Sequence, residues 1–228
     1  MELKPYHIEQ GYKNHATLFV YHGLRALVVL TAIYYLVLAN FESAAATFVV
    51  VALMYLPSFV KSRYRLYLPF ALDLWIVSFI FLTLFVGGVG NVYNDFPIWD
   101  KLLHFQSGLL LAAAGYVAIY LLNESEGTSL DLSPGFISVF AVAFALALGV
   151  MWEMLEFFGD LTFGSSWQNG NTDTMVDLIA DGIGAVIFSA GAYFWMYRHK
   201  RVPFTPRLLK FYEKAKKVAK EMQTGVRK

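Results

Sequence analysis

The chain has 228 residues, of which 57% are hydrophobic and only 15% are charged, and it contains no cysteine. A soluble globular domain usually carries about 25% charged residues, and the mean hydropathy here is +0.51. These figures exclude an intrinsically disordered chain, a collagen-like fibre and a disulfide-stapled secreted scaffold, and they argue strongly against a soluble enzyme. We therefore predict an integral membrane protein, whose function must be inferred from the polar side chains within its apolar runs.

Six apolar stretches are long enough to cross a bilayer, whose hydrocarbon core of about 30 Å needs about 20 helical residues. In chain order they cover residues 17–39, 43–60, 67–88, 102–122, 135–157 and 175–197. The second stretch is short and contains Pro57 near its end. The pattern predicts an all-α fold, a polytopic membrane helix bundle with six transmembrane helices that forms one transmembrane domain over residues 1–200.

Lysine and arginine are distributed unequally between the segments that join these spans. If the N-terminus is inside, sixteen of the 18 fall on the inner side, only Lys101 falls in an outer segment, and Arg25 lies within the first span. Segments rich in positive charge stay on the cytoplasmic side of a membrane. We therefore predict a multi-pass protein of the cell membrane with both termini in the cytoplasm.

A basic segment, residues 201–228, follows the last span. After two prolines, apolar residues recur at helical spacing among lysines, at Leu208, Phe211, Ala215, Val218 and Met222. This pattern predicts an amphipathic interfacial helix on the anionic inner leaflet, with membrane lipids and not nucleic acid as its partner. The alternative is a solvated basic tail that only satisfies the positive-inside rule.

Two charged residues lie inside the otherwise apolar first half, Arg25 in the first span and Asp73 near the start of the third. A charge at mid-bilayer costs at least about 2.5–3.5 kcal/mol on insertion scales, so each needs a partner or a function. Because both spans run outward, the two residues should lie at similar depth. We predict a structural Arg25–Asp73 ion pair, with His22 nearby.

The second half carries three acidic stripes. They comprise Asp100 and His104 at the start of the fourth span, Glu153, Glu156 and Asp160 at the end of the fifth, and Asp173, Asp177 and Asp181 at the start of the sixth. Spacings of three, four and seven residues put each set on one face of a helix. With both termini inside, all three stripes converge on the outer half of the membrane, where the predicted loops 89–99 and 158–172 cover them.

So many carboxylates beside a single Lys101 cannot all stay ionised, and the cluster must share protons, bind cations or both. Many carboxylates with one imidazole and no thiolate suit a divalent ion, either Mg²⁺, Mn²⁺, Ca²⁺ or Zn²⁺. The predicted metal ligands are Asp100, His104, Glu153, Asp177 and Asp181, with Asp160 and Asp173 as further candidates, and Glu156 is the candidate general base. Asp160 and Asp173 also suit a simpler role as loop or helix-cap residues.

Small residues near the stripes predict which helices approach closely. Gly108 with Ala112, and Ala180 with Gly184, are pairs of small residues spaced four apart, a pattern that lets membrane helices pack tightly. Such packing would bring the acidic stripes of the fourth and sixth spans together. Most of the aromatic residues Trp99, Trp152, Trp167, Trp195 and Tyr197 lie near span ends and are assigned to the interfacial aromatic belt.

Residues 95–195 resemble the VanZ-like membrane proteins. The run DKLLHF at residues 100–105 is similar to the DKxxHF opening of that group, and DTMVDL at 173–178, followed by DGIGA at 181–185, is similar to its D-x-x-x-D…GA segment. The YjdF-type branch of inner-membrane proteins also pairs an acidic WE-x-x-E stretch with a later segment of this kind. The resemblance implies an outward-facing site at the cell envelope, and because the group has no agreed reaction it leaves the chemistry open.

Three functions remain open from the sequence. The first is a metal-dependent hydrolase or transferase acting on an envelope lipid or a lipid-linked phosphate. The second is a cation or proton transporter, although the fifth and sixth spans are nearly apolar below Glu153 and Asp181. The third is a non-catalytic lipid-binding protein with a structural metal. The sequence specifies neither the substrate nor the oligomeric state.

Overall fold

The computed structural model describes residues 15–64, 70–123, 132–164 and 167–199. The described elements are all helices, so the predicted all-α fold is confirmed, and six of the apolar helical stretches are long enough to cross a membrane. They form two compact units, which divide between Val92 and Tyr93 and are called here the N-terminal and C-terminal units. The single transmembrane domain over residues 1–200 stays a prediction, and the predicted interfacial helix in 201–228 lies outside the described residues.

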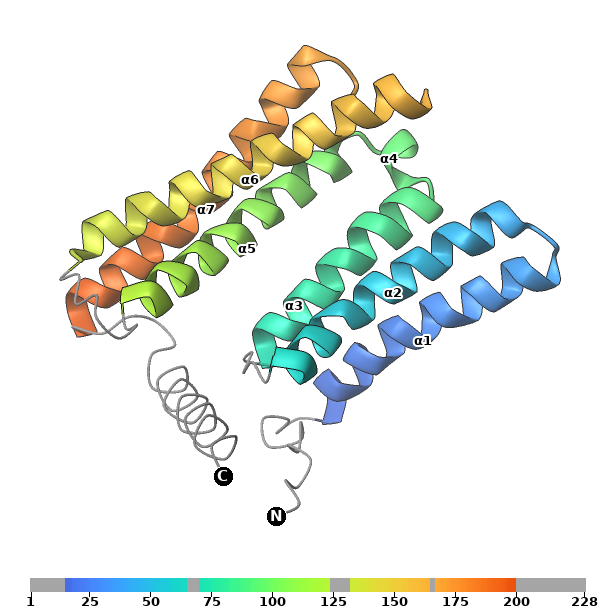
Figure 1. Cartoon of the computed structure of the whole chain (residues 1–228), viewed down its shortest axis with the longest axis horizontal. Helices are drawn as coiled ribbons and strands as arrows, with labels where there is room; N and C mark the ends of the chain where they lie inside the picture. Colours follow the sequence, from blue (N-terminus) through green and yellow to red (C-terminus); the bar gives the residue numbers. More distant parts are fainter. Residues whose placement is uncertain (1–14, 65–69, 124–131, 165–166, 200–228) are drawn as a thin grey trace, which may run out of the picture. The chain divides into compact units, whose positions relative to one another are not determined.

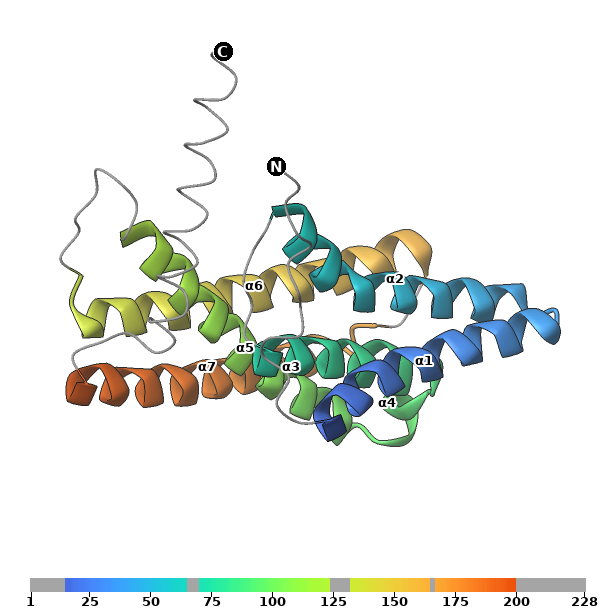
Figure 2. The same cartoon turned by 90° about the horizontal axis from the view of Figure 1, so that it is seen from below.

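The N-terminal unit contains the first three predicted spans. It consists of α1 (His15–Val37), α2 (Phe41–Tyr64), α3 (Phe70–Ile80) and the π-helix η2 (Phe81–Val89), which continues α3. Helices α1 and α2 form a hairpin (Figures 1 and 2), whose tight turn includes Ala39 at a φ of 54°. Its buried core contains Tyr21, Val28, Val50, Met54 and Val77. Each of the three apolar stretches is thus helical. This is expected in lipid, where backbone N–H and C=O groups must form their hydrogen bonds within the protein.

The two buried charged residues of this unit, Arg25 and Asp73, do not pair with each other as predicted. Asp73 forms an ion pair with Lys61 and accepts a hydrogen bond of 2.9 Å from the Tyr21 hydroxyl. Arg25 donates instead to the Met54 carbonyl oxygen at 2.7 Å and stacks on the Tyr21 ring at 4.1 Å. The predicted direct Arg25–Asp73 pair is therefore wrong, because the lysine at the end of α2 reaches the carboxylate while the flat guanidinium packs on an aromatic face.

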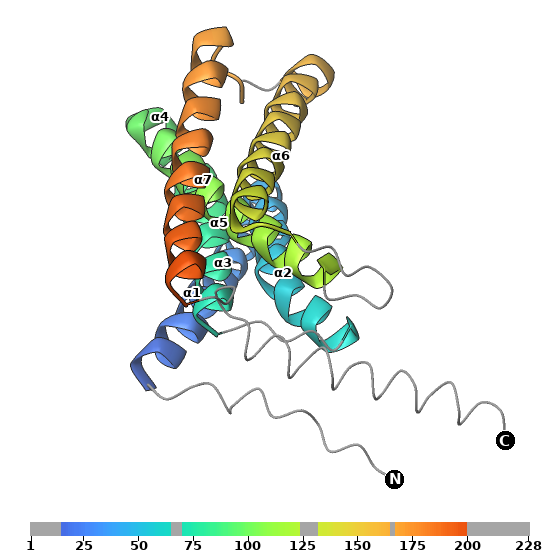
Figure 3. The same ribbon diagram turned by 90° about the vertical axis from the view of Figure 1, so that its left-hand side faces the viewer.

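The C-terminal unit is a three-helix bundle that carries all three acidic stripes. After the short α4 (Val92–Asp95), it consists of α5 (Ile98–Asn123), α6 (Pro134–Phe163) and α7 (Asn171–His199), which lie side by side in Figures 1 and 3. Its core is built from small and apolar side chains: Ala112, Tyr116, Ile119, Ile137, Ala141, Ala145, Ala185, Ala192 and Met196. Five alanines in this core let the three backbones approach closely.

Two glycines set the contact between α5 and α7. A Cβ atom at Gly108 would overlap the backbone carbonyl of Asp181, and one at Gly184 would overlap the backbone carbonyl of Phe105. The close packing of these two helices, predicted from their small residues, is thus confirmed. It places Asp181 of α7 beside Gly108 in the third turn of α5.

The ends of α6 and α7 differ from the sequence prediction. Helix α6 continues to Phe163, six residues beyond the predicted end, and stops where Gly164 adopts a φ of 66° and its N–H bonds to the Asp160 carbonyl oxygen at 3.0 Å. Glycine takes this left-handed conformation without steric cost, so it sets the helix end. Helix α7 begins at Asn171. Asp173 therefore lies within its first turn and is not the N-cap.

Candidate functional site

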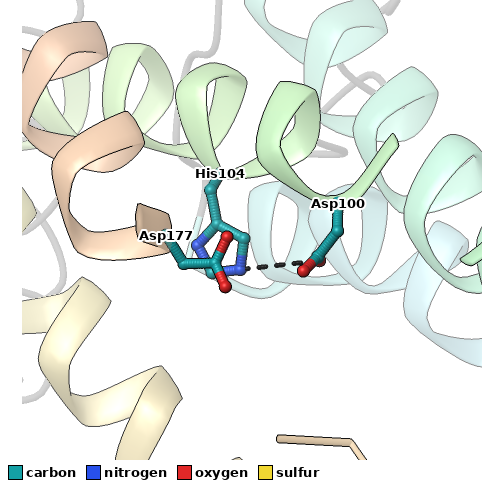
Figure 4. A group of neighbouring side chains, drawn as sticks. All are labelled: Asp100, His104 and Asp177. Atoms are coloured by element: carbon teal, nitrogen blue, oxygen red, sulfur yellow. Dashed lines mark ion pairs between the residues drawn. The ribbon is translucent and has the colours of Figure 1, made fainter. Parts of the chain in front are cut away.

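One end of the C-terminal unit brings the three acidic stripes together. The N-terminal turns of α5 supply Asp100 and His104, which lie one turn apart, and α7 supplies Asp177 across from them. Each of the three residues offers one potential ligand atom, and these atoms all lie within 4.8 Å of one another. In Figure 4 the Asp177 carboxylate overlaps the His104 ring, and a dashed line joins the ring to Asp100. The helical spacing of the sequence thus produces a compact set of one nitrogen and two oxygen donors.

The His104 ring is anchored on one side by Asp181. Its Nδ1 lies 3.2 Å from Oδ2 of Asp181, whose other oxygen, Oδ1, accepts a hydrogen bond from the Ser107 hydroxyl. Asp181 is completely buried and His104 is 7% exposed. Both carboxylate oxygens of Asp181 are therefore engaged, and the imidazole is held with Nδ1 toward Asp181 and its other nitrogen away from that carboxylate.

That other nitrogen faces two more carboxylates without bonding to either. His104 Nε2 lies 3.7 Å from Asp100 Oδ1 and 3.8 Å from Glu153 Oε1. Glu153 is 5% exposed, and although Thr174 hydrogen-bonds its carboxylate, Oε1 itself has no hydrogen-bond partner among the described residues. These separations exceed the reach of a hydrogen bond. The imidazole nitrogen and the two carboxylate oxygens, all potential metal ligands, therefore face one another without direct contact.

Lys101 supplies the positive charge nearest to the cluster. Its Nζ lies 2.7 and 2.8 Å from the two oxygens of Asp177 and 3.0 Å from Asp100, and it also pairs with Asp173. One ammonium group thus pairs with three carboxylates from two helices and balances the charge of only one of them. The side chain of Lys101 is largely buried, with 18% exposed. Lys101 therefore gives Asp173 a structural ion-pair partner. Its ammonium group also competes with any ion that would bind to Asp100 and Asp177.

The remaining two sequence candidates lie on α6. Glu156 is half-buried and its Oε1 accepts a hydrogen bond of 2.8 Å from the indole N–H of Trp152. Asp160 accepts hydrogen bonds from the backbone N–H groups of Trp167 at 2.8 Å and Gln168 at 2.9 Å, which tie the loop back onto α6. The observed contacts of Asp160 are those of a loop anchor. Its role as a ligand, like those of the other candidates, stays a prediction.

Three residues of the site were not singled out from the sequence as parts of it: Ser107, which anchors Asp181, Thr174, which bonds Glu153, and Trp152, which bonds Glu156. Helical spacing could have found them, because Ser107 is three residues after His104, Thr174 is three before Asp177, and Trp152 is four before Glu156. Uncharged side chains carry no such conspicuous signal in a membrane span.

The geometry suits a divalent cation of borderline hardness. Two ligand atoms each about 2.1 Å from a tetrahedral ion are separated by about 3.4 Å, which is close to the 3.7 and 3.8 Å between His104 Nε2 and its two carboxylate neighbours. An imidazole with several carboxylates binds Zn²⁺ or Mn²⁺ well, whereas Ca²⁺ and Mg²⁺ prefer oxygen ligands alone.

Comparison with known proteins places the chain in a family. A family model described as a predicted membrane protein (DUF2238) matches residues 20–199. A protein of Thermotoga maritima described as uncharacterized is 30% identical over 141 residues, which are 58% of this chain and 70% of that protein. The chain belongs to the DUF2238 family.

A second match is local. The mouse voltage-gated purine nucleotide uniporter SLC17A9 is 45% identical over 56 residues, which are 25% of this chain and only 12% of the transporter. No solved structure matches the chain.

Proposed function

We propose that this member of the DUF2238 family binds a divalent metal ion at the acidic end of its C-terminal unit and uses it to hydrolyse or transfer a phosphate group carried by a membrane lipid. The observation that carries the proposal is the convergence of Asp100, His104 and Asp177, whose ligand atoms lie within 4.8 Å of one another. The buried, unbonded Oε1 of Glu153, directed at His104 from α6, supports a fourth ligand.

The proposed ligand set is Asp100, His104, Glu153 and Asp177. It contains one nitrogen and three carboxylates, which is enough to hold Zn²⁺ or Mn²⁺ and to leave a position for water or substrate. Asp160 is left out because both of its oxygens hold the loop. Asp173 keeps its contact with Lys101, whose ammonium group has to leave Asp100 and Asp177 when the ion binds.

The chemistry of the proposed reaction follows from the groups around this set. A divalent ion polarises a phosphoryl oxygen and lowers the pKa of a bound water. Glu156 follows Glu153 by three residues on the same face of α6, which suits it to accept the proton of the attacking water. The Trp152 indole N–H holds one oxygen of Glu156 and leaves the other for that task. Lys101, once released, would hold the phosphate.

A lipid substrate and an outward-facing site are further parts of the proposal. The site residues lie on helices that are candidate membrane spans, so an amphiphile in the bilayer reaches them with its headgroup at the helix ends. The excess of lysine and arginine in the predicted inner segments supports cytoplasmic termini and thus an outward-facing site. The resemblance to the VanZ-like group supports an envelope role in the same way.

The packing below the site favours this function over transport. Next to the acidic cluster the core of the C-terminal unit consists of Ala112, Ala145 and Ala185, each with no exposed surface. A cation pathway needs polar side chains or water-filled space along its whole length. The apolar seam instead closes the cluster on one side, as in a site that admits ligand from one end.

Metal content of the purified full-length protein tests the binding step. We expect about one equivalent of Zn²⁺ or Mn²⁺ by elemental mass spectrometry, and a loss of most of it in Asp177→Asn and Glu153→Gln. Asp73→Asn is the matched control, because Asp73 is equally buried but belongs to the N-terminal unit. If the wild-type protein holds no ion after incubation with either metal, the proposed function is wrong.

Turnover is tested separately with the same preparations. We expect metal-dependent release of phosphate from phosphatidic acid or a polyprenyl phosphate in vesicles, reduced about 10²–10⁴-fold in Glu156→Gln, which is the range for loss of a general base. Metal content should be unchanged in this variant. Metal binding without any turnover on either lipid class would contradict the enzymatic part and favour a structural metal.

A further inference from the structure

We propose that Asp181 is a positioning residue for His104 and not a metal ligand. It holds the proton on Nδ1, so that the lone pair of Nε2 is directed at the ion. The inference rests on the proposed metal site and revises the sequence prediction, in which Asp181 was itself a ligand. A histidine ligand commonly donates its second ring N–H to a carboxylate, which fixes its tautomer and orientation and makes it a stronger ligand.

The contacts of Asp181 leave it no free oxygen. Oδ2 lies 3.2 Å from His104 Nδ1, and Oδ1 accepts from Ser107. Ser107 Oγ also lies 2.8 Å from the His104 carbonyl oxygen, so the same hydroxyl links the carboxylate to the turn of α5 that carries the imidazole. Asp181 thus contacts the imidazole directly, and Ser107 lies within hydrogen-bond distance of both Asp181 and the His104 backbone.

The surroundings of Asp181 prevent it from moving into the ligand set. It has no exposed surface, and a Cβ atom at Gly149 would come within 2.6 Å of its Oδ2. Its backbone carbonyl is pressed against Gly108. Asp181 is therefore confined between Gly108 on α5 and Gly149 on α6. Its carboxylate contacts the Nδ1 side of the imidazole, whereas Asp100 and Glu153 face the Nε2 side.

The opposite nitrogen faces the proposed ion position. His104 Nε2 lies 3.7 Å from Asp100 Oδ1 and 3.8 Å from Glu153 Oε1, which has no hydrogen-bond partner among the described residues although Glu153 is 95% buried. A protonated Nε2 would direct a hydrogen at this position and block it. The carboxylate on Nδ1 favours the tautomer that leaves the lone pair of Nε2 free for an ion.

Metal affinity distinguishes a positioning residue from a ligand. We titrate Mn²⁺ and Zn²⁺ into the metal-free full-length protein and expect Asp181→Asn to weaken binding about 10–100-fold while one equivalent still binds at saturation. Gly149→Ala, which alters no side chain that bonds the imidazole but crowds Oδ2, should act in the same direction. Asp73→Asn should leave the affinity unchanged. Complete loss of binding in Asp181→Asn, as in Asp177→Asn, would show that Asp181 is itself a ligand and overturn the inference.

The tautomer of His104 provides a readout that does not depend on the metal. In ¹⁵N-histidine-labelled, metal-free protein, the His104 signals are assigned by their absence in His104→Asn. We expect the proton on Nδ1 in the wild type, and loss of that preference in Asp181→Asn but not in Asp73→Asn. A neutral His104 ring that carries its single proton on Nε2 contradicts the inference whether or not metal binds. Failure of the wild type to bind metal, with the Nδ1 proton in place, would instead refute the proposed function alone.

Discussion

Replacing Lys101 by methionine tests whether its ammonium group occupies the place of the proposed ion. In the structure Nζ contacts both oxygens of Asp177 at 2.7 and 2.8 Å and Asp100 at 3.0 Å, and both carboxylates belong to the proposed ligand set. An ion can use them only if the lysine leaves. Lys101→Met keeps the length of the apolar stem and removes the competing charge, so we expect the variant to bind metal more tightly and to fold less stably without it.

The size of both effects follows from the burial of the pair. Removing one partner of a buried ion pair costs about 3–5 kcal/mol. Because the side chain of Lys101 is 18% exposed and that of Asp177 only 2%, we expect a loss of unfolding free energy near the lower end of this range in the metal-free variant. In the wild type an ion must also displace Lys101 from Asp100 and Asp177, which we expect to cost about 1.4–2.8 kcal/mol of binding free energy. Lys101→Met does not pay this cost, so its metal affinity should be about ten- to hundredfold higher.

Isothermal titration with Mn²⁺ and Zn²⁺ and thermal unfolding with and without metal measure the two quantities. Lys61→Met is the matched control, because Lys61 and Asp73 form an ion pair with almost the same exposed fractions, 19% and 2%, in the other unit. It should lose similar stability without any change in metal affinity. If Lys101→Met binds metal no more tightly than the wild type, the lysine does not compete with an ion, and the three carboxylates around it are a structural network.

Three further perturbations test the packing and the metal linkage. Gly184→Ala should lower the unfolding free energy by about 1–3 kcal/mol, because its Cβ meets the Phe105 carbonyl. Gly191→Ala is the control on the same helix: nothing lies within 4 Å of that position, so the change should be neutral or stabilising by up to about 1 kcal/mol. Equal effects of the two variants in thermal unfolding would contradict the observed α5–α7 contact. Tyr116→Phe removes a hydrogen bond of 2.7 Å to Ser138 and should cost about 0.5–1.5 kcal/mol, which denaturant unfolding in detergent measures; no loss of stability would show that this bond contributes nothing. Chelation of a bound ion present at a hundredfold excess over its Kd should remove about 2.7 kcal/mol of stability, seen as a lower unfolding temperature in wild type but not in Asp177→Asn; an identical shift in both would place the ion elsewhere.

Most of the fold follows from local features of the chain. The six apolar stretches are helices because a span in lipid must satisfy its backbone hydrogen bonds within itself, and the small residues at Gly108 and Gly184 correctly indicate the α5–α7 contact. The end of α6 was missed because hydropathy falls near residue 157 while the helix continues to Phe163, after which Gly164 forms a left-handed cap. The π-helical continuation of α3 had no signal in the sequence that we could identify.

The sequence by itself determined that Asp100, His104, Glu153, Asp177 and Asp181 would share the faces of three helices at one end of a bundle, because a 3.6-residue period fixes the angular position of each side chain on its own helix. It could not fix the rotation and axial offset of one helix against another. Those two quantities decide which oxygen meets which nitrogen. Only the tertiary structure therefore placed Asp181 behind His104, put Lys101 among three carboxylates and gave Asp73 to Lys61 in place of Arg25.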